Sequence, residues 1–230
     1  MPAATGGKAT DMNSLARALG APVLGTLLLF GGAAQAVTVL TAQLTNDQET
    51  AVVVPTLTTG ELRPVSFGNA TFEIDDAMTS MSWTATVFNI DIDGTQSTDI
   101  NDNLTAAHIH GPAAPGANAG VIWGFIGNPF NDNNPNDVVV TPFASDVGFT
   151  VSGKWDLPEG NNNITFAERV GIILDGLTYM NFHTVQFGGG EVRGQILVVP
   201  EPETYLLMLA GLASVGAMVR RRRGAPMAAA

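Results

Sequence analysis

The stretch Thr178–Leu197 reads Thr-Tyr-Met-Asn-Phe-His-Thr-Val-Gln-Phe-Gly-Gly-Gly-Glu-Val-Arg-Gly-Gln-Ile-Leu and predicts two strands joined by a glycine turn. Side chains in its first half alternate between two faces, with Tyr179, Asn181 and His183 on one and Met180, Phe182 and Thr184 on the other. This period of two is typical of a half-buried strand.

The second half of the stretch predicts the return strand. Gly188–Gly190 can adopt positive φ and therefore reverse the chain direction. The return strand then places Glu191, Arg193 and Gln195 on one face and Val192, Ile196 and Val198 near the other. We expect an antiparallel strand pair here.

Further strands are predicted upstream from alternating or apolar segments bounded by turn residues. They cover Val37–Thr45, Ala70–Ile74, Ser82–Ile90, Leu104–His110, Gly120–Ile126, Val138–Val140 and Gly148–Val151. A short helix from about Phe166 to Leu174 is expected before the strand pair, because Thr165 and Glu168 have capping-box spacing. The pattern predicts an all-β fold, an antiparallel immunoglobulin-like sandwich with one short helix.

Composition limits the class of function. The 230 residues suffice for one domain plus targeting segments, and the absence of cysteine excludes disulfides and thiolate metal sites. Residues 37–199 contain four basic and eighteen acidic residues, a balance of −14. A surface this acidic repels nucleic acid, so nucleic-acid binding is not expected.

The chain has three histidines, which admit two interpretations. His108 and His110 are two residues apart on a predicted strand and share a face. If His183 lies nearby, the three imidazoles suit zinc or copper. The favoured alternative is a structural polar network with Asn181, Glu191 and Arg193, because buried polar groups need hydrogen-bond partners. No serine or cysteine nucleophile lies in a recognisable motif, so the sequence does not predict an enzyme.

Two polar runs, Asp91–Asn103 and Asn131–Asp137, are rich in carboxylates and amides. Such oxygen ligands suit calcium. Asp-Gly and Asn-Asp clusters are also ordinary turn formers, and neither run has EF-hand spacing. We expect solvated loops at both places, with calcium as the less favoured alternative.

Two motifs give the sequence a family resemblance. Tyr-Met-Asn-Phe-His-Thr at 179–184, with Gly-Glu-Val-Arg-Gly-Gln-Ile at 190–196, resembles the closing signature of a CHRD (chordin-like) domain. The other part of the signature is Ala-Ala-His-Ile-His-Gly-Pro-Ala at 106–113. The resemblance covers roughly Val39 to Val199, and we assign residues 37–199 to this domain. It implies no particular activity, because CHRD domains lack a generally established one.

Residues 1–36 are predicted to be a secretory signal peptide. Arg17 supplies the positive region, Ala21–Phe30 the apolar stretch, and Ala34 and Ala36 flank a small-x-small cleavage site. Translation from Met12 instead of Met1 would give a signal of ordinary length. A buried N-terminal helix is the less favoured alternative.

The C-terminal segment resembles a PEP-CTERM sorting signal, assigned to residues 200–224, with 225–230 as a tail. Pro200-Glu201-Pro202 precedes an apolar run, Tyr205–Val219. The basic cluster that follows the run consists of Arg220, Arg221, Arg222 and Arg223. The run predicts a transmembrane helix that serves as a temporary anchor, with the arginines on the cytoplasmic side. A permanent single-pass anchor is the alternative.

The resemblance implies that an exosortase-type enzyme cuts near Pro200–Pro202 and releases the domain or attaches it to an envelope or exopolysaccharide component. The sequence thus predicts an exported, non-catalytic structural or binding component of the cell envelope or biofilm matrix. The alternatives are a metal-binding protein or metalloenzyme using His108, His110 and His183, and a calcium-stabilised adhesin.

Overall fold

The computed structural model describes residues 37–156, 158–200 and 202–223. The predicted signal peptide with Ala34 and Ala36, residues 201 and 224 of the sorting segment, and the tail 225–230 lie outside these residues. The described strands are β1 (Thr38–Thr45), β2 (Phe67–Ile74), β3 (Met81–Phe88), β4 (Leu104–His110), β5 (Val121–Ile126), β6 (Val139–Pro142), β7 (Gly148–Trp155), β8 (Tyr179–Thr184), β9 (Val192–Gln195) and β10 (Leu197–Val198). The helices are α1 (Phe166–Leu174) and α2 (Pro202–Arg223), with short 3-10 turns at Asn46–Gln48 and Asn161–Asn163.

The strands form one antiparallel sheet in the order β5-β4-β8-β9-β1-β2-β3-β7-β6, with β10 also paired to β1. This confirms the predicted all-β class. The immunoglobulin-like sandwich of two separate sheets is not confirmed, because Thr45 of β1 pairs with Arg193 of β9 and joins the strands into one sheet.

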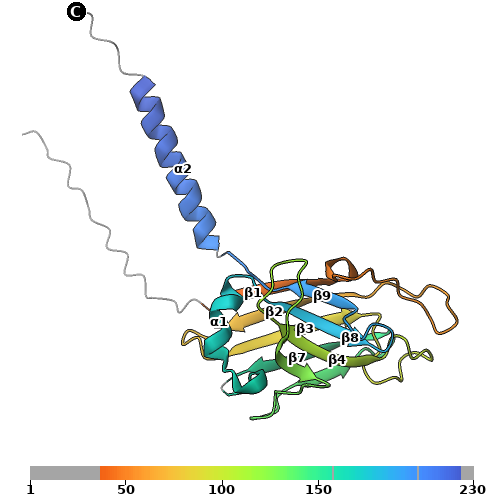
Figure 1. Cartoon of the computed structure of the whole chain (residues 1–230). Helices are drawn as coiled ribbons and strands as arrows, with labels where there is room; N and C mark the ends of the chain where they lie inside the picture. Colours follow the sequence, from red (N-terminus) through yellow and green to blue (C-terminus); the bar gives the residue numbers. More distant parts are fainter. Residues whose placement is uncertain (1–36, 157, 201, 224–230) are drawn as a thin grey trace, which may run out of the picture. The chain divides into compact units, whose positions relative to one another are not determined.

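The sheet curls so that its two halves pack face to face (Figure 1). Trp83 of β3 contacts Phe125 of β5, with ring centroids 4.4 Å apart, although these strands are far apart in the sheet order. Phe149 of β7 meets Phe182 of β8 in the same way. The core is therefore an aromatic and aliphatic layer enclosed by one curled sheet.

The strand pair β8–β9 is more deeply buried than its sequence predicts. All side chains of β8 and β9 are buried, whereas β2 alternates between exposed and buried as expected of a surface strand. Met180 and Phe182 join the apolar core. On the other face of β8, Tyr179 and His183 are 2% and 8% exposed, so the prediction of a half-buried strand is wrong.

Local signals predicted several boundaries correctly. β4, β8 and α1 have the predicted bounds. The Glu168 carboxylate accepts hydrogen bonds from the N–H and hydroxyl of Thr165, at 2.7 and 2.9 Å, and so closes the start of α1. Within the predicted glycine turn, Gly190 takes the positive φ, at 125°.

The C-terminal helix α2 begins at Pro202, within the predicted sorting motif, and its last turn contains the basic cluster Arg220, Arg221, Arg222 and Arg223. Of the helices that the structure describes, none combines the length and apolar character required to span a membrane. The predicted transmembrane helix is therefore not confirmed. The cytoplasmic placement of Arg220, Arg221, Arg222 and Arg223 depends on that helix and is likewise not confirmed.

Candidate functional site

Strand register brings the three histidines together. β4 and β8 are antiparallel neighbours in which His108 lies opposite Asn181 and His110 lies opposite Tyr179. His183 is two residues beyond Asn181, so it lies on the same face as His108 and diagonally across from it. Adjacent strands thus assemble residues that are far apart in sequence.

The three imidazoles form a compact, enclosed cluster. One ring nitrogen from each of His108, His110 and His183 lies within 4.8 Å of the others, and the residues are 5%, 8% and 8% exposed. His108 Nδ1 is 3.3 Å from His183 Nε2. This distance is that of a hydrogen bond between the two rings, in which His108 Nδ1–H donates to His183 Nε2.

Backbone carbonyls fix two of the rings. His110 Nδ1–H donates to the Ala119 carbonyl at 3.0 Å, and His183 Nδ1–H donates to the Gly188 carbonyl at 3.1 Å. Their Nε2 atoms therefore carry the lone pairs. Metal-binding histidines are usually held by such a second hydrogen bond. The Nε2 atoms of His108 and His110 are buried without a hydrogen-bond partner.

The environment keeps all three rings neutral. Burial, together with the neighbouring histidines, lowers the pKa of His108 to about 4. Burial also lowers the pKa of His110 to about 4, against the opposing effect of the Ala119 carbonyl. The pKa of His183 is lowered by burial and by Arg193, with the Gly188 carbonyl opposing. Because metal ions bind neutral imidazole, the cluster is ready for a ligand at neutral pH.

An aromatic and cationic layer covers one side of the cluster. The Tyr179 ring stacks on His110 with centroids 4.9 Å apart, and the Arg193 guanidinium lies 4.3 Å from the Tyr179 centroid. Two Arg193 nitrogens donate to Glu49 Oε2, at 2.6 and 2.9 Å, and another donates to the Ala117 carbonyl. Arg193 therefore links the loop before β2, through Glu49, to the loop before β5, through Ala117. Both loops are thereby held over the histidines.

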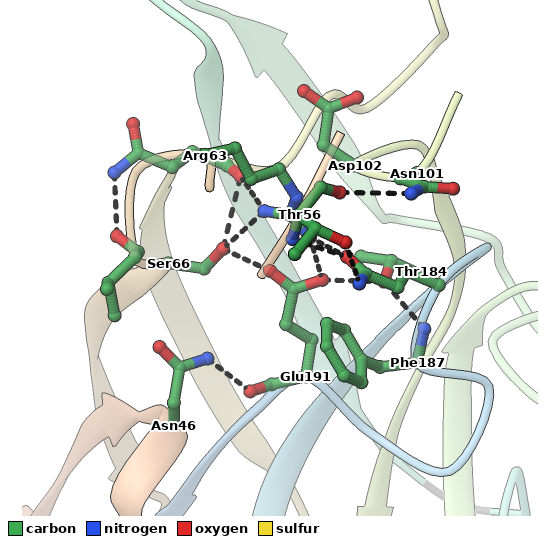
Figure 2. A network of polar contacts seen from close by, with 12 residues as sticks. Asn46, Thr56, Arg63, Ser66, Asn101, Asp102, Thr184, Phe187 and Glu191 are labelled. Atoms are coloured by element: carbon green, nitrogen blue, oxygen red, sulfur yellow. Dashed lines mark hydrogen bonds and ion pairs between the residues drawn. The ribbon is translucent and has the colours of Figure 1, made fainter. Parts of the chain in front are cut away.

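Glu191 and Arg193 of the predicted polar network have partners other than the histidines. Glu191 accepts hydrogen bonds from Arg63, at 2.6 Å, and from Ser66 and Thr184, as Figure 2 shows. Arg193 binds Glu49 instead of Glu191. Asn181 lies opposite Arg193 in the sheet, and its Oδ1 is buried without a partner.

Sequence reasoning missed Arg63 and Glu49, the partners of the two buried charges. Arg63 is 6% exposed, and its ion pair with Glu191 is almost fully enclosed. The available sequence signal was the scarcity of basic residues, since residues 37–199 contain only four. In the structure two of these four, Arg63 and Arg193, are buried in ion pairs. The partner of each still depends on the fold.

The first polar run is organised by hydrogen bonds within the loop. Asp91 is fully buried and accepts backbone N–H groups from Asp93 and Gly94 on Oδ1 and from Gln96 and Ser97 on Oδ2. Both oxygens of this carboxylate are thus occupied, as expected of an ordered turn.

Comparison with known families places the chain. The CHRD domain model matches residues 40–196, more than half of the chain, and the PEP-CTERM protein-sorting motif matches residues 198–223, which include the whole arginine cluster 220–223. Comparisons with curated proteins and with solved structures found no match. The PEP-CTERM motif implies export and processing by an exosortase-type enzyme. The predicted family resemblance is confirmed on both counts: the chain belongs to the CHRD domain family and carries a PEP-CTERM sorting motif.

Proposed function

We propose that this chain is an exported, non-catalytic protein whose CHRD domain serves as a structural or binding component of the cell envelope or the exopolysaccharide matrix. The observation that carries this proposal is the order of the matches, because the sorting motif begins at residue 198, directly after the domain match ends at 196. Cleavage near Pro200–Pro202, after the last strand β10, would separate the folded domain from its sorting segment.

Two features support a non-catalytic role. No serine or cysteine nucleophile lies in a recognisable motif, and the three histidines are at most 8% exposed. In this proposal the exosortase-type enzyme is a processing partner, the membrane is a transient one, and an envelope or exopolysaccharide component is the lasting partner.

The test is to follow the chain in cells that have an exosortase-type enzyme. We expect the mature form to lack the segment after Pro200–Pro202 and to occur outside the cytoplasm. Replacement of Pro200, Glu201 and Pro202 by alanine is expected to leave the longer, membrane-associated form. Equal processing of the variant and the unaltered chain would contradict the proposal.

A second function has specific geometric support, namely metal binding by His108, His110 and His183. The supporting observation is that three neutral, enclosed imidazoles converge while the Nε2 atoms of His108 and His110 lack a partner. Imidazole suits zinc and copper. Such an ion with three protein ligands keeps a coordination position for water or another small ligand, which is the arrangement of a metalloenzyme.

Elemental analysis of the full chain, purified without chelator, tests this second function. We expect close to one equivalent of zinc or copper, lost in the His108→Ala/His110→Ala variant. If the unaltered protein takes up neither ion when each is added, the histidines have a structural role and the metal proposal is wrong.

A further inference from the structure

The second polar run encloses a buried carboxylate that its surroundings satisfy only in part. Asp132 is 0% exposed. Its Oδ2 accepts the N–H groups of Asp137 and Val138, each at 3.0 Å, whereas its Oδ1 is buried without a partner. Burying a carboxylate oxygen without a hydrogen bond is costly, so Asp132 requires an explanation that Asp91 does not.

A second carboxylate, from another part of the chain, reaches the same loop. Glu159 follows β7 and is 4% exposed. Its Oε1 accepts the N–H groups of Asn133 and Asn134, at 3.0 and 2.7 Å, whereas its Oε2 is also buried without a partner. Two acids of distant sequence positions therefore hold one loop and each retains one unpaired oxygen.

The local charges do not neutralise this pair. Burial raises the pKa of Asp132, and the charges of Asp137 and Asp156 raise it further. Burial likewise raises the pKa of Glu159, with a further contribution from the charges of Asp132 and Asp156. Lys154, which lies nearby, forms its ion pair with Asp156 at 2.8 Å. The region thus has an excess of negative charge that a cation would compensate.

The loop also supplies neutral oxygen ligands around a cavity. A surface cavity of about 410 Å³ is lined by Glu159 and by asparagines of both segments: Asn131, Asn133, Asn134, Asn162 and Asn163. Asp132 lies behind this lining, between Asn131 and Asn133 in sequence. Carboxylate and amide oxygens are the ligands that hard divalent cations prefer, and calcium accepts irregular shells of six to eight oxygens. These residues offer neither sulfur nor imidazole, so a zinc or copper site is not indicated here.

We propose that Asp132 and Glu159 bind a calcium ion, with asparagine side chains and water completing its shell. This site is separate from the histidine cluster and does not depend on the function proposed above. Bound calcium would neutralise the two carboxylates and join the segment before β6 to the segment after β7.

Calcium titration of the full chain after chelator treatment at pH 7.5 tests the proposal. We expect one bound calcium by calorimetry and a rise in melting temperature of roughly 5–10 °C at a concentration about 100 times Kd. Glu159→Gln is expected to abolish this rise, whereas Glu73→Gln, which alters an exposed acid on β2, should retain it. Failure of the unaltered chain to bind calcium would overturn the proposal.

Chemical-shift mapping of the unaltered protein locates the ion even if Glu159→Gln does not fold. Calcium is expected to shift the amide signals of residues 131–134, 136–138 and 159–163. Shifts confined to residues 91–103 would overturn the assignment to Asp132 and Glu159. If Glu159→Gln loses calcium binding but still binds zinc, the calcium site is distinct from the histidine cluster.

Discussion

Acid sensitivity of the histidine cluster provides the sharpest test of the site geometry. His108 and His110 have a pKa of about 4 in the folded chain, against an ordinary value of 6.5. Below pH 6.5 the unfolded chain therefore binds protons that the folded chain rejects. The free energy of unfolding is therefore unaffected by protonation of these two imidazoles above pH 6.5 and decreases as the pH falls from 6.5 toward 4.

The size of the effect follows from these values. For a pKa lowered from 6.5 to about 4, acidification from pH 7.5 to 5.0 removes roughly 2 kcal/mol from the free energy of unfolding. The contributions of His108 and His110 are coupled and cannot be added, because His110 itself helps to lower the pKa of His108. Replacing His110 by glutamine is expected to reduce the loss by roughly 2 kcal/mol or more, against the 5–15 kcal/mol typical of a domain.

Urea unfolding of the unaltered chain and of His110→Gln, at both pH values and with chelator present, measures the difference. Buried carboxylates with a raised pKa, such as Glu49, gain stability on acidification, but they do so in both proteins and cancel in the comparison. The absolute stability of the variant does not matter, because only its pH dependence is compared. If both proteins lose the same free energy, the imidazoles are not held neutral by burial and the reasoning fails.

Two further predictions concern the fold around the site. Glu191→Gln leaves a buried guanidinium without its counter-charge and is expected to lower the free energy of unfolding by roughly 3–5 kcal/mol in denaturant titrations, whereas the exposed Glu73→Gln should change it by less than about 0.5 kcal/mol. Gly124→Ala on β5 places a methyl group against a backbone carbonyl of the following loop, so we expect lower expression of folded protein and a melting temperature reduced by several degrees. Gly188→Ala faces open space, and an equal loss in that control would show that the contact at Gly124 is not the cause.

Some features of the fold follow from local sequence alone. The period of two in β4 and β8 and the capping pair Thr165 and Glu168 depend on residues a few positions apart, and their predicted bounds agree with the structure. The family motifs were also readable in sequence, because they lie on these same segments.

Burial of β8 could not be read from its pattern. Tyr179, Asn181 and His183 look like the solvent face of a strand, but they are at most 8% exposed. Tyr179 contacts the backbone of Ala119, and His183 contacts the carbonyl of Gly188 in the following turn. Likewise, Glu191 and Arg193 lie two residues apart and suggest a common network, yet each pairs with a charge more than a hundred residues away. Pairing of buried charges depends on which segments the fold brings together.

The sequence by itself therefore determined the β class, the family, the sorting motif and the shared face of His108 and His110, because each depends on local order along the chain. Only the tertiary structure decided that the sheet is single and curled, that His183 joins the other two histidines, and that Asp132 and Glu159 meet at one loop. Strand register and loop packing act between distant residues, and a single sequence does not specify those distances.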